Sequence, residues 1–560
     1  MKGFMRIGID GFYISSALLA FTLTAQAAPV APDAGQTSQE LRPSPELVSP
    51  EAAQPLLIEN SAPKTADNEQ GGQINVTAFR VTGSQVFSAS ELEALVSDLT
   101  GGEHKLAELN AGVARITAYY RSHGYLVARA YLPAQDIKEG VVTIAVLEGH
   151  VGEQRINNQS RLSDERANGY LSGIRSGEAL QTKSADRALL LLNDTPGVGS
   201  AKATLQPGTS VGTSDLVVEL TPSAPYTENV ELDNYGNRYT GENRLGAELA
   251  FNSPLKLGDQ ISLNALVSDQ HLSYVKFAYQ IPVGNNGLRV GASYSDTRYQ
   301  LGKEFSGLQA HGSAANASLY AMYPFIRSQA SNLSGIATLE RKKLNDSTDA
   351  PVTSSDRQVQ LVNLGVAGNH RDMSGGAGLT TCEVSLASGK LDMDATSLAA
   401  DALSAKNNGS FSRLNYSIKR LQRLAASNSL SLMLSGQFAS KNLNTSEKLY
   451  LGGASTVRAY PQGEASGDEG YLANLELHHD YTSTLQALLF YDGGAVKINR
   501  NPYAAGSNNR YIAGVGVGVN AIYAGMQFKV SVAWRTSGGT PTSVPSRREP
   551  RLWLLAGKQF

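Results

Sequence analysis

The chain has 560 residues and a formal net charge of −2, and charged residues make up only 18% of it, below the roughly 25% of soluble domains. The near-neutral balance excludes a strongly basic nucleic-acid binder, and the single cysteine, Cys382, excludes an intrachain disulfide. Glycine (55 residues) and tyrosine (24) are abundant, and no stretch after the N-terminal segment has 18 consecutive apolar residues. This composition favours a β-barrel that meets lipid.

Residues 1–27 have the pattern of a secretory signal peptide. Lys2 and Arg6 supply positive charge, residues 12–24 are mostly apolar, and Ala25-Gln26-Ala27 matches a small-x-small cleavage site. The apolar stretch is too short for a membrane anchor. We expect the mature chain to begin near Ala28, outside the cytoplasm.

Residues 28–73 are predicted to be a linker. They contain seven of the 21 prolines, among Ala, Ser, Gln and Glu, and such a composition cannot build a hydrophobic core. The sequence leaves open whether part of this linker forms a helix that plugs the barrel.

Residues 74–149 are predicted to form a small domain with the order β-α-α-β-β. Residues 74–81 alternate like a strand, and Ser88 with Glu91 forms a capping box that begins the first helix. The second helix ends at Gly124, and two strands follow at 127–132 and 141–147. One face of that second helix collects its apolar residues, Leu109, Val113, Ile116 and Tyr120.

Residues 150–222 are predicted to repeat this plan. A strand at 151–156 precedes a helix after Ser163, a second helix carries residues 189–192, and strands follow at 201–205 and 216–220. Gly124 precedes Ala128-Arg129-Ala130 by the same spacing as Gly197 precedes Ala201-Lys202-Ala203. This echo indicates two copies of one domain.

From residue 223 to residue 560 the helical periodicity stops and period-two alternation dominates. In one predicted hairpin, residues 275–281 and 288–294 alternate on either side of Gly284-Asn285-Asn286-Gly287. The polar face consists mainly of Ser, Gly, Asn, Gln and Ala, as a hydrated lumen requires. At ~20 residues per strand and connection, this region predicts about 16 transmembrane strands, and it ends on the aromatic Phe560.

Three motifs in this region carry a family resemblance. Leu451 to Tyr460 reads LGGASTVRAY, Phe490 to Gly494 reads FYDGG, and Asp233-Asn234-Tyr235-Gly236 stands at the start of the barrel region. With Gly124-Tyr125 and residues 133–136 of the first domain, they resemble the haemolysin secretion/activation family. These proteins are the two-partner secretion transporters (TpsB) of the POTRA-containing barrel-assembly superfamily.

The resemblance implies which residues act in the lumen. Val457, Arg458, Ala459 and Tyr460 would form the tip of a long loop that folds into the barrel. Asp492 would face Arg458 as its ion-pair partner. The same strand motif would contribute Phe490, Gly493 and Gly494. Ala459 stands where the family has glycine, which restricts the backbone there.

The resemblance also implies an architecture and a function. It predicts a mostly β protein, with two periplasmic POTRA domains (74–149 and 150–222) before a 16-stranded barrel (223–560) in the outer membrane of a Gram-negative bacterium. The barrel would translocate a large exoprotein of the TpsA type, bound through the POTRA domains, and act as a monomer in outer-membrane lipid. No enzymatic activity, cofactor, metal or nucleic acid is implied. A barrel-assembly insertase and a passive porin are the alternatives.

Two physical hypotheses concern the lumen. Because a hydrated lumen screens charge, we expect breaking an Arg458–Asp492 pair to cost ~1–2 kcal/mol rather than the ~3–5 kcal/mol of a dry core. Gly514, Gly516 and Gly518 would leave a bare strip on the wall. This strip either makes room for the folded-in loop or relieves barrel curvature.

Two other signals are set aside. Residues 208–212 match the G-x-S-x-G hydrolase pattern, but they join two predicted strands where a nucleophile elbow needs a strand followed by a helix. His478 and His479 are adjacent on a predicted strand, so they point to opposite faces and are poorly placed to share a metal ion.

Overall fold

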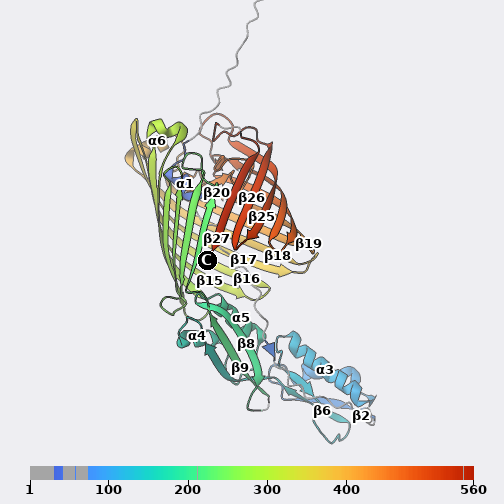
Figure 1. The fold of residues 1–560 in the computed structure, drawn as a ribbon. Helices are drawn as coiled ribbons and strands as arrows, with labels where there is room; N and C mark the ends of the chain where they lie inside the picture. The colour runs from blue at the N-terminus through green and yellow to red at the C-terminus, as the bar shows by residue number, and fades with distance from the viewer. Residues whose placement is uncertain (1–30, 42–56, 59–72, 211, 546–547) are drawn as a thin grey trace, which may run out of the picture.

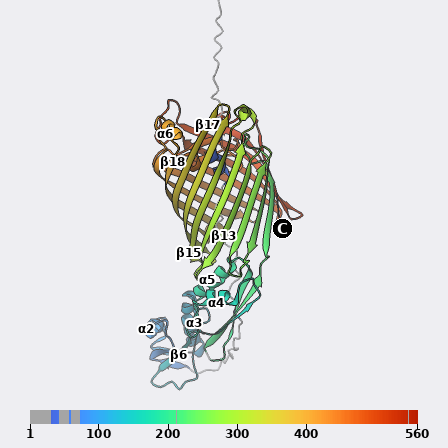
Figure 2. The same ribbon diagram turned by 90° about the vertical axis from the view of Figure 1, so that its left-hand side faces the viewer.

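The computed structural model describes residues 31–41, 57–58, 73–210, 212–545 and 548–560. The predicted signal peptide and most of the predicted linker lie outside the described residues. Two α+β domains lie in series beyond one end of a closed barrel (Figures 1 and 2). The helix α1 (Ala34–Glu40) lies within the barrel, toward the end that is farther from these domains. No helix among the described residues is long and apolar enough to cross a bilayer.

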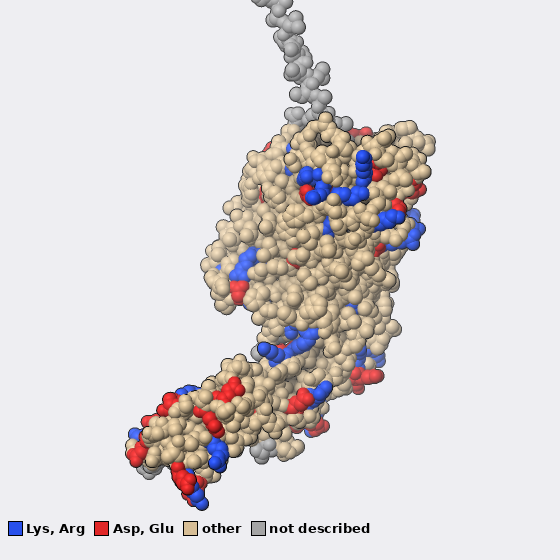
Figure 3. Space-filling model, turned by 180° about the vertical axis from the view of Figure 1, so that it is seen from behind, with Lys and Arg blue, Asp and Glu red and all other residues tan. Residues whose placement is uncertain are grey.

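Charged side chains are unevenly distributed over the surface. They gather on the α+β domains and toward the far end of the barrel, whereas the middle of the barrel wall is largely uncharged (Figure 3). That distribution matches a barrel whose middle faces hydrocarbon.

The first α+β domain has a three-stranded sheet in which β6 lies between β3, its parallel neighbour, and β5, its antiparallel neighbour. The predicted strand at 74–81 is divided at Thr77, because its first part pairs with β4 instead. The predicted strand at 127–132 is only three residues long. The elements are β2 (Ile74–Val76), β3 (Ala78–Thr82), α2 (Ala89–Ala94), the 3-10 helix η1 (Ser97–Leu99), β4 (Gly102–His104), α3 (Leu106–Ser122), β5 (Arg129–Tyr131) and β6 (Val141–Leu147).

The helices of this domain follow their sequence signals. The Ser88 side chain accepts a hydrogen bond from the backbone N–H of Glu91 and so caps α2. Gly124 has a φ of +92° just after α3, a conformation that costs glycine little. The four apolar residues expected on one face of α3 are all buried.

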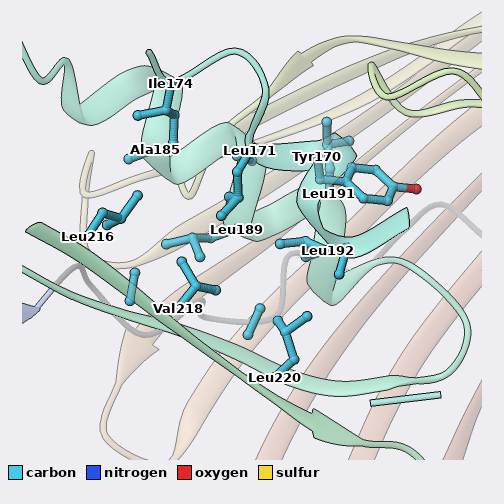
Figure 4. Packing of buried hydrophobic residues seen from close by; sticks show 14 of the residues in the cluster. Tyr170, Leu171, Ile174, Ala185, Leu189, Leu191, Leu192, Leu216, Val218 and Leu220 are labelled. Atoms are coloured by element: carbon cyan, nitrogen blue, oxygen red, sulfur yellow. The ribbon is translucent and has the colours of Figure 1, made fainter. Parts of the chain in front are cut away.

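The second α+β domain has β9 at the centre of its sheet, with β7 parallel and β8 antiparallel to it. Its helices pack on one face of the sheet through a cluster that includes Leu189, Leu192 and Val218 (Figure 4). A two-residue strand from the linker, β1 (Leu57–Ile58), pairs in parallel with the outer edge of β8. The other elements are β7 (His150–Asn158), α4 (Asp164–Leu171), α5 (Thr182–Asn193), β8 (Val198–Pro207) and β9 (Thr213–Pro222).

The barrel is closed and has 16 antiparallel strands, as predicted, with β27 pairing back to β10. Its strands are β10 (Tyr226–Asp233), β11 (Arg244–Asn252), β12 (Gln260–Ser268), β13 (Ser273–Val283), β14 (Leu288–Gln300), β15 (His311–Arg327), β16 (Ser331–Asp349), β17 (Val352–Asp372), β18 (Gly378–Met393), β19 (Gly409–Ala425), β20 (Asn428–Ala439), β23 (Glu469–Thr482), β24 (Leu485–Lys497), β25 (Asn509–Tyr523), β26 (Met526–Ser537) and β27 (Arg551–Gln559).

The connections hold shorter elements. The 3-10 helix η2 (Lys303–Leu308) follows β14, and α6 (Ala395–Ala402) follows β18. The connection between β20 and β23 is long and contains η3 (Thr445–Glu447), β21 (Leu449–Leu451) and β22 (Ala465–Gly467).

The second α+β domain rests on the barrel turns at one end. Arg187 donates to the carbonyl oxygens of Asn286 and Pro324, and Arg166 donates to that of Pro282. The Arg327 guanidinium binds the Asp194 carboxylate through two nitrogens, at 2.6 and 2.7 Å. The short turn predicted near Asn285 therefore lies on the same side as the α+β domains.

Candidate functional site

The long loop between β20 and β23, residues 440–468, folds back into the barrel. Its strands β21 and β22 pair with each other, and Leu451, Val457 and Tyr460 are completely buried. They pack against residues of the barrel wall, among them Leu472, Phe490 and Ile512. The loop is therefore a packed part of the barrel interior.

Arg458 and Asp492 meet at the centre of this interface. The Arg458 guanidinium approaches both carboxylate oxygens of Asp492, with Nη2–Oδ1 at 2.7 Å and Nε–Oδ2 at 2.8 Å. The Arg458 backbone N–H also donates to Oδ2 at 3.1 Å. Two parallel charge-assisted bonds of this kind fix direction as well as distance.

Arg458 has two further partners on the wall. Its Nη2 lies 2.8 Å from a carboxylate oxygen of Glu476, and its guanidinium carbon lies 3.4 Å from the centre of the Phe490 ring. A guanidinium that stacks on an aromatic face gains cation–π energy. This contact gives Phe490, singled out only as part of a motif, a direct role in holding the loop.

The expectation of a hydrated pair is wrong. The Arg458 side chain is 11% exposed and that of Asp492 is 1% exposed, because the apolar residues of the loop tip close over them. Removing one partner would therefore leave a buried charge, and the cost is closer to ~3–5 kcal/mol than to the ~1–2 kcal/mol of a screened pair.

The glycine strip has two explanations, one for each part. A Cβ on Gly514 would lie 2.2 Å from the Ala459 Cβ, so Gly514 makes room for the loop. On Gly516 a Cβ would lie 2.2 Å from the Phe490 ring, and on Gly518 it would lie 3.2 Å from the Leu488 side chain. These two glycines accommodate side chains of the neighbouring strand.

The remaining motif residues also have distinct surroundings. Tyr460 places its hydroxyl 2.8 Å from the carbonyl oxygens of Ser537 and Gly539. Gly494 makes room for the loop, because a Cβ there would lie 2.9 Å from the Leu451 side chain, whereas Gly493 meets only ordinary contacts at 3.4 Å. Gly452, Gly453 and Gly463 have positive φ angles in this loop, whereas Ala459 does not. The alanine at this position is therefore not strained.

Three buried acidic residues, Glu447, Glu464 and Asp468, hold the loop and were missed by the sequence reasoning. Glu464 accepts hydrogen bonds from Arg510 and from the backbone and hydroxyl groups of Thr542 and Ser543. Asp468 forms an ion pair with Lys448, and Glu447 is bound by Lys342 and Arg413. Their sequence signal was weak, since an acidic residue in a Gly-rich loop is normally solvated.

The helix α1 occupies another part of the lumen. Asp33 caps it by accepting from Gln36 N–H, and also binds Arg357 at 3.0 Å and the Thr445 hydroxyl at 2.7 Å. Two cavities of about 420 and 300 Å³ adjoin the helix and are lined mainly by polar residues of the wall. This side of the lumen is less tightly packed than the loop side.

The signals set aside in the sequence have structural surroundings of their own. His478 contacts Glu476, whereas His479 contacts Asn428 on the neighbouring strand. The backbone N–H of Gly208 donates a hydrogen bond to the carbonyl oxygen of Thr213, which closes the β8–β9 connection. Within the described residues there is no cluster of three His, Cys, Asp or Glu side chains suited to a metal ion.

Comparison with known proteins gives two family matches and a set of full-length relatives. Residues 212–521 match the family described as haemolysin secretion/activation protein ShlB/FhaC/HecB, and residues 74–149 match the POTRA domain of ShlB type. The chain is 30% identical over 567 residues to the heme/hemopexin transporter protein HuxB of Haemophilus influenzae (strain 86-028NP), covering 98% of this chain and 97% of that protein.

Two transporters named CdiB are also similar. The chain is 26% identical over 522 residues to the outer membrane transporter CdiB of Dickeya dadantii (strain 3937), covering 89% of this chain and 88% of that protein. The solved structure of CdiB from Escherichia coli superposes with a TM-score of 0.72 at 21% identity, covering 91% of this chain and 94% of that one. The chain therefore belongs to the haemolysin secretion/activation family, the outer-membrane transporters of two-partner secretion.

Proposed function

We propose that this transporter exports one large partner exoprotein, which docks on the POTRA domains as an extended chain and then threads through a single barrel. The family assignment supports export over the two alternatives, the insertase and the passive porin. The closed ring of 16 strands encloses a complete lumen within one chain, which supports a monomer as the working unit.

A sheet edge supports docking of an extended chain. The backbone of β8 in the second POTRA domain already pairs with β1, through Leu57 with Thr204 and Ile58 with Leu205. Main-chain pairing at an edge gives affinity with little demand on sequence. This pairing is the observation that carries the docking proposal, since a cargo strand could replace β1 in the same register.

The first POTRA domain offers a second edge. Its strand β5 pairs with β6 on one side only among the described strands, and Tyr131 on it is 36% exposed. We infer that the cargo contacts this edge and then the edge of β8, because the two domains lie in series below the barrel (Figure 1).

The route through the lumen runs past α1. The cavities beside this helix, lined by Ser293, Asn316 and Ser385 among others, offer hydrogen-bonding groups to an extended chain. Because α1 occupies this space, it has to move before cargo passes.

The relatives suggest a class of cargo. HuxB of Haemophilus influenzae is named a heme/hemopexin transporter protein. We propose an exoprotein that binds haem or haemopexin as the first cargo to test.

Deleting the POTRA domains tests the function. The full chain and a variant lacking residues 75–222 are each expressed with a candidate exoprotein of the TpsA type, and cargo in the medium is quantified. We expect the variant to form a heat-modifiable barrel in the outer membrane and to export none. Cargo in the medium at normal yield would overturn the docking role.

A finer variant tests the β8 edge. Replacing Leu57 and Ile58 with proline removes the backbone donors of β1. We expect cross-linking between cargo and β8 to increase, because the edge is vacated. Unchanged cross-linking would show that cargo does not use the β8 edge.

A further inference from the structure

The outward face of strands β15–β18 carries a groove of about 800 Å³. Strand alternation decides which side it is on. Glu340 and Asn363 line the lumen cavity beside α1, so Leu339 and Val362, their neighbours in sequence, point away from the lumen. The groove therefore opens toward the membrane, on the wall that faces the viewer in Figure 2.

The lower part of this groove is apolar. Leu319 and Leu339 are more than half exposed, and Val362 is 44% exposed. The small side chains of Ala292 and Ala317 leave the depression between them. A surface of this shape suits a hydrocarbon chain that lies along the wall.

The upper part is cationic. Arg341 pairs with Gln360 and Gln360 with Lys390 across β16, β17 and β18, so all three point outward in one row. Lys343 is the next outward residue above Arg341. Asp392 forms an ion pair with Lys390 at 2.7 Å, so the rows of Arg341 and Lys343 together carry a net charge of +2, and Asp356 lies one outward row above them.

The height of the rim matches the outer edge of the membrane. Arg341 lies ten residues beyond Ser331, where β16 leaves the turn that adjoins the second POTRA domain. At roughly 3.3 Å per residue and a tilt of about 45°, it stands about 25 Å above that turn, which equals the height of an apolar barrel band.

The described residues of the opposite wall present a different surface. Those exposed toward the same end include Tyr471, Tyr491, Tyr511 and Trp534, the uncharged aromatic residues typical of a membrane-interface girdle. The cationic rim is therefore a local feature of β16–β18, and a general interface belt does not account for it.

We propose that this groove binds a phosphorylated glycolipid of the outer leaflet. An acyl chain lies along Leu319, Leu339 and Val362, and Arg341, Lys343 and Lys390 bind the phosphate. Guanidinium and ammonium groups are the natural partners of phosphate, and strands two apart lie roughly 10 Å from each other, so the long side chains reach one phosphate group. This lipid site is independent of the identity of the cargo.

The test uses the full chain purified in detergent and three lipids. They are a bisphosphorylated lipid A, its dephosphorylated form with the same acyl chains, and a zwitterionic phospholipid, and binding is measured by native mass spectrometry and by the shift in Tm. Arg341→Gln with Lys343→Gln and Lys390→Gln removes the cationic rim. Lys138→Gln with Lys183→Gln and Lys202→Gln removes the same charge from exposed positions on the POTRA domains as a matched control.

We expect the wild type and the control to bind the bisphosphorylated lipid at least tenfold more tightly than the rim variant does. Ala317→Trp, which fills the groove and keeps the charges, should also weaken binding. Equal binding by the rim variant, no preference for phosphate, or the same loss in the control would overturn the proposal. Tight binding of another protein to this face, with no lipid bound, would overturn it too.

Discussion

Two sides of the same lumen differ in how they hold what lies inside them. The loop 440–468 packs against β23–β26 through a continuous apolar cluster, and its ion pair with Asp492 is enclosed within that cluster. The helix α1 lies beside β14–β17 and touches the loop at Thr445. It buries Ala34 in a small apolar cluster, makes polar contacts through Asp33, and adjoins cavities of about 420 and 300 Å³.

The difference separates a fixed part from a movable one. Releasing the loop would expose apolar surface and leave a buried charge unpaired, and both changes are costly. Releasing α1 would uncover a smaller apolar surface and would leave Arg357 paired with Asp346, so it costs less than releasing the loop. We therefore expect the loop to stay docked during export while α1 leaves.

The largest effect is expected from Arg458→Ala, which leaves Asp492 buried without its main partner. At ~3–5 kcal/mol the equilibrium constant for docking of the loop should fall at least a hundredfold. Secretion should collapse, while the protein still assembles in the membrane. Arg458→Lys should recover only part, because a point charge cannot replace the two-point contact. Cargo yield and protease cleavage of the loop measure both effects.

The charge swap tests whether attraction between Arg458 and Asp492 holds the loop in its docked position. Arg458→Asp combined with Asp492→Arg should secrete better than the worse single variant. Recovery should stay incomplete, because Glu476 would then face an aspartate. If the two single effects simply add, the residues act separately and the pair does not hold the loop.

A smaller loss is expected from Gly514→Ala. The added methyl group would overlap Ala459 at 2.2 Å, and overpacking of this kind costs ~1–3 kcal/mol. Gly246→Ala on β11 is the matched control, because its Cβ would meet nothing closer than 4.0 Å. Secretion equal to that of the control would show that the loop does not dock tightly against Gly514.

For α1, Asp33→Ala should weaken docking by about 1 kcal/mol, since it removes the cap of the helix and its contact with Arg357. Single-channel conductance in planar bilayers should rise, with little change in barrel stability. Ser38→Ala, on the same helix beside the cavity, should leave conductance near the wild-type level. An unchanged conductance for Asp33→Ala would place the anchor of α1 elsewhere.

Inserted tags should have the smallest effect on stability. They test which end of the barrel faces the cell surface. A tag at Asn285 should be shielded from surface labels in intact cells, because that turn adjoins the second POTRA domain. A tag at Val352, which is 87% exposed at the other end of the barrel, should be labelled. The reverse pattern would invert the barrel.

Local patterns in the sequence were enough for most of the fold. Period-two alternation from residue 223 onward predicted the 16 strands, and the face of Leu109, Val113, Ile116 and Tyr120 predicted α3. These signals are readable because the residues that share a face of a strand or helix are only a few positions apart in sequence.

The site was predictable only in part. The motif resemblance identified Arg458 and Asp492 as a pair, although they lie 34 residues apart in sequence. It did not show that the pair is dry, nor that Phe490 stacks beneath the guanidinium, nor that Glu464 clamps the loop to Thr542 and Ser543.

Only the tertiary structure decided those features, because burial and long-range partners depend on how the loop packs against distant strands. The placement of β1 on β8 and of α1 in the lumen has the same origin. A proline-rich linker carries no periodicity of its own. The sequence by itself therefore determined the architecture of the barrel and the identity of its central pair, and the packing of the lumen determined how strongly each part is held.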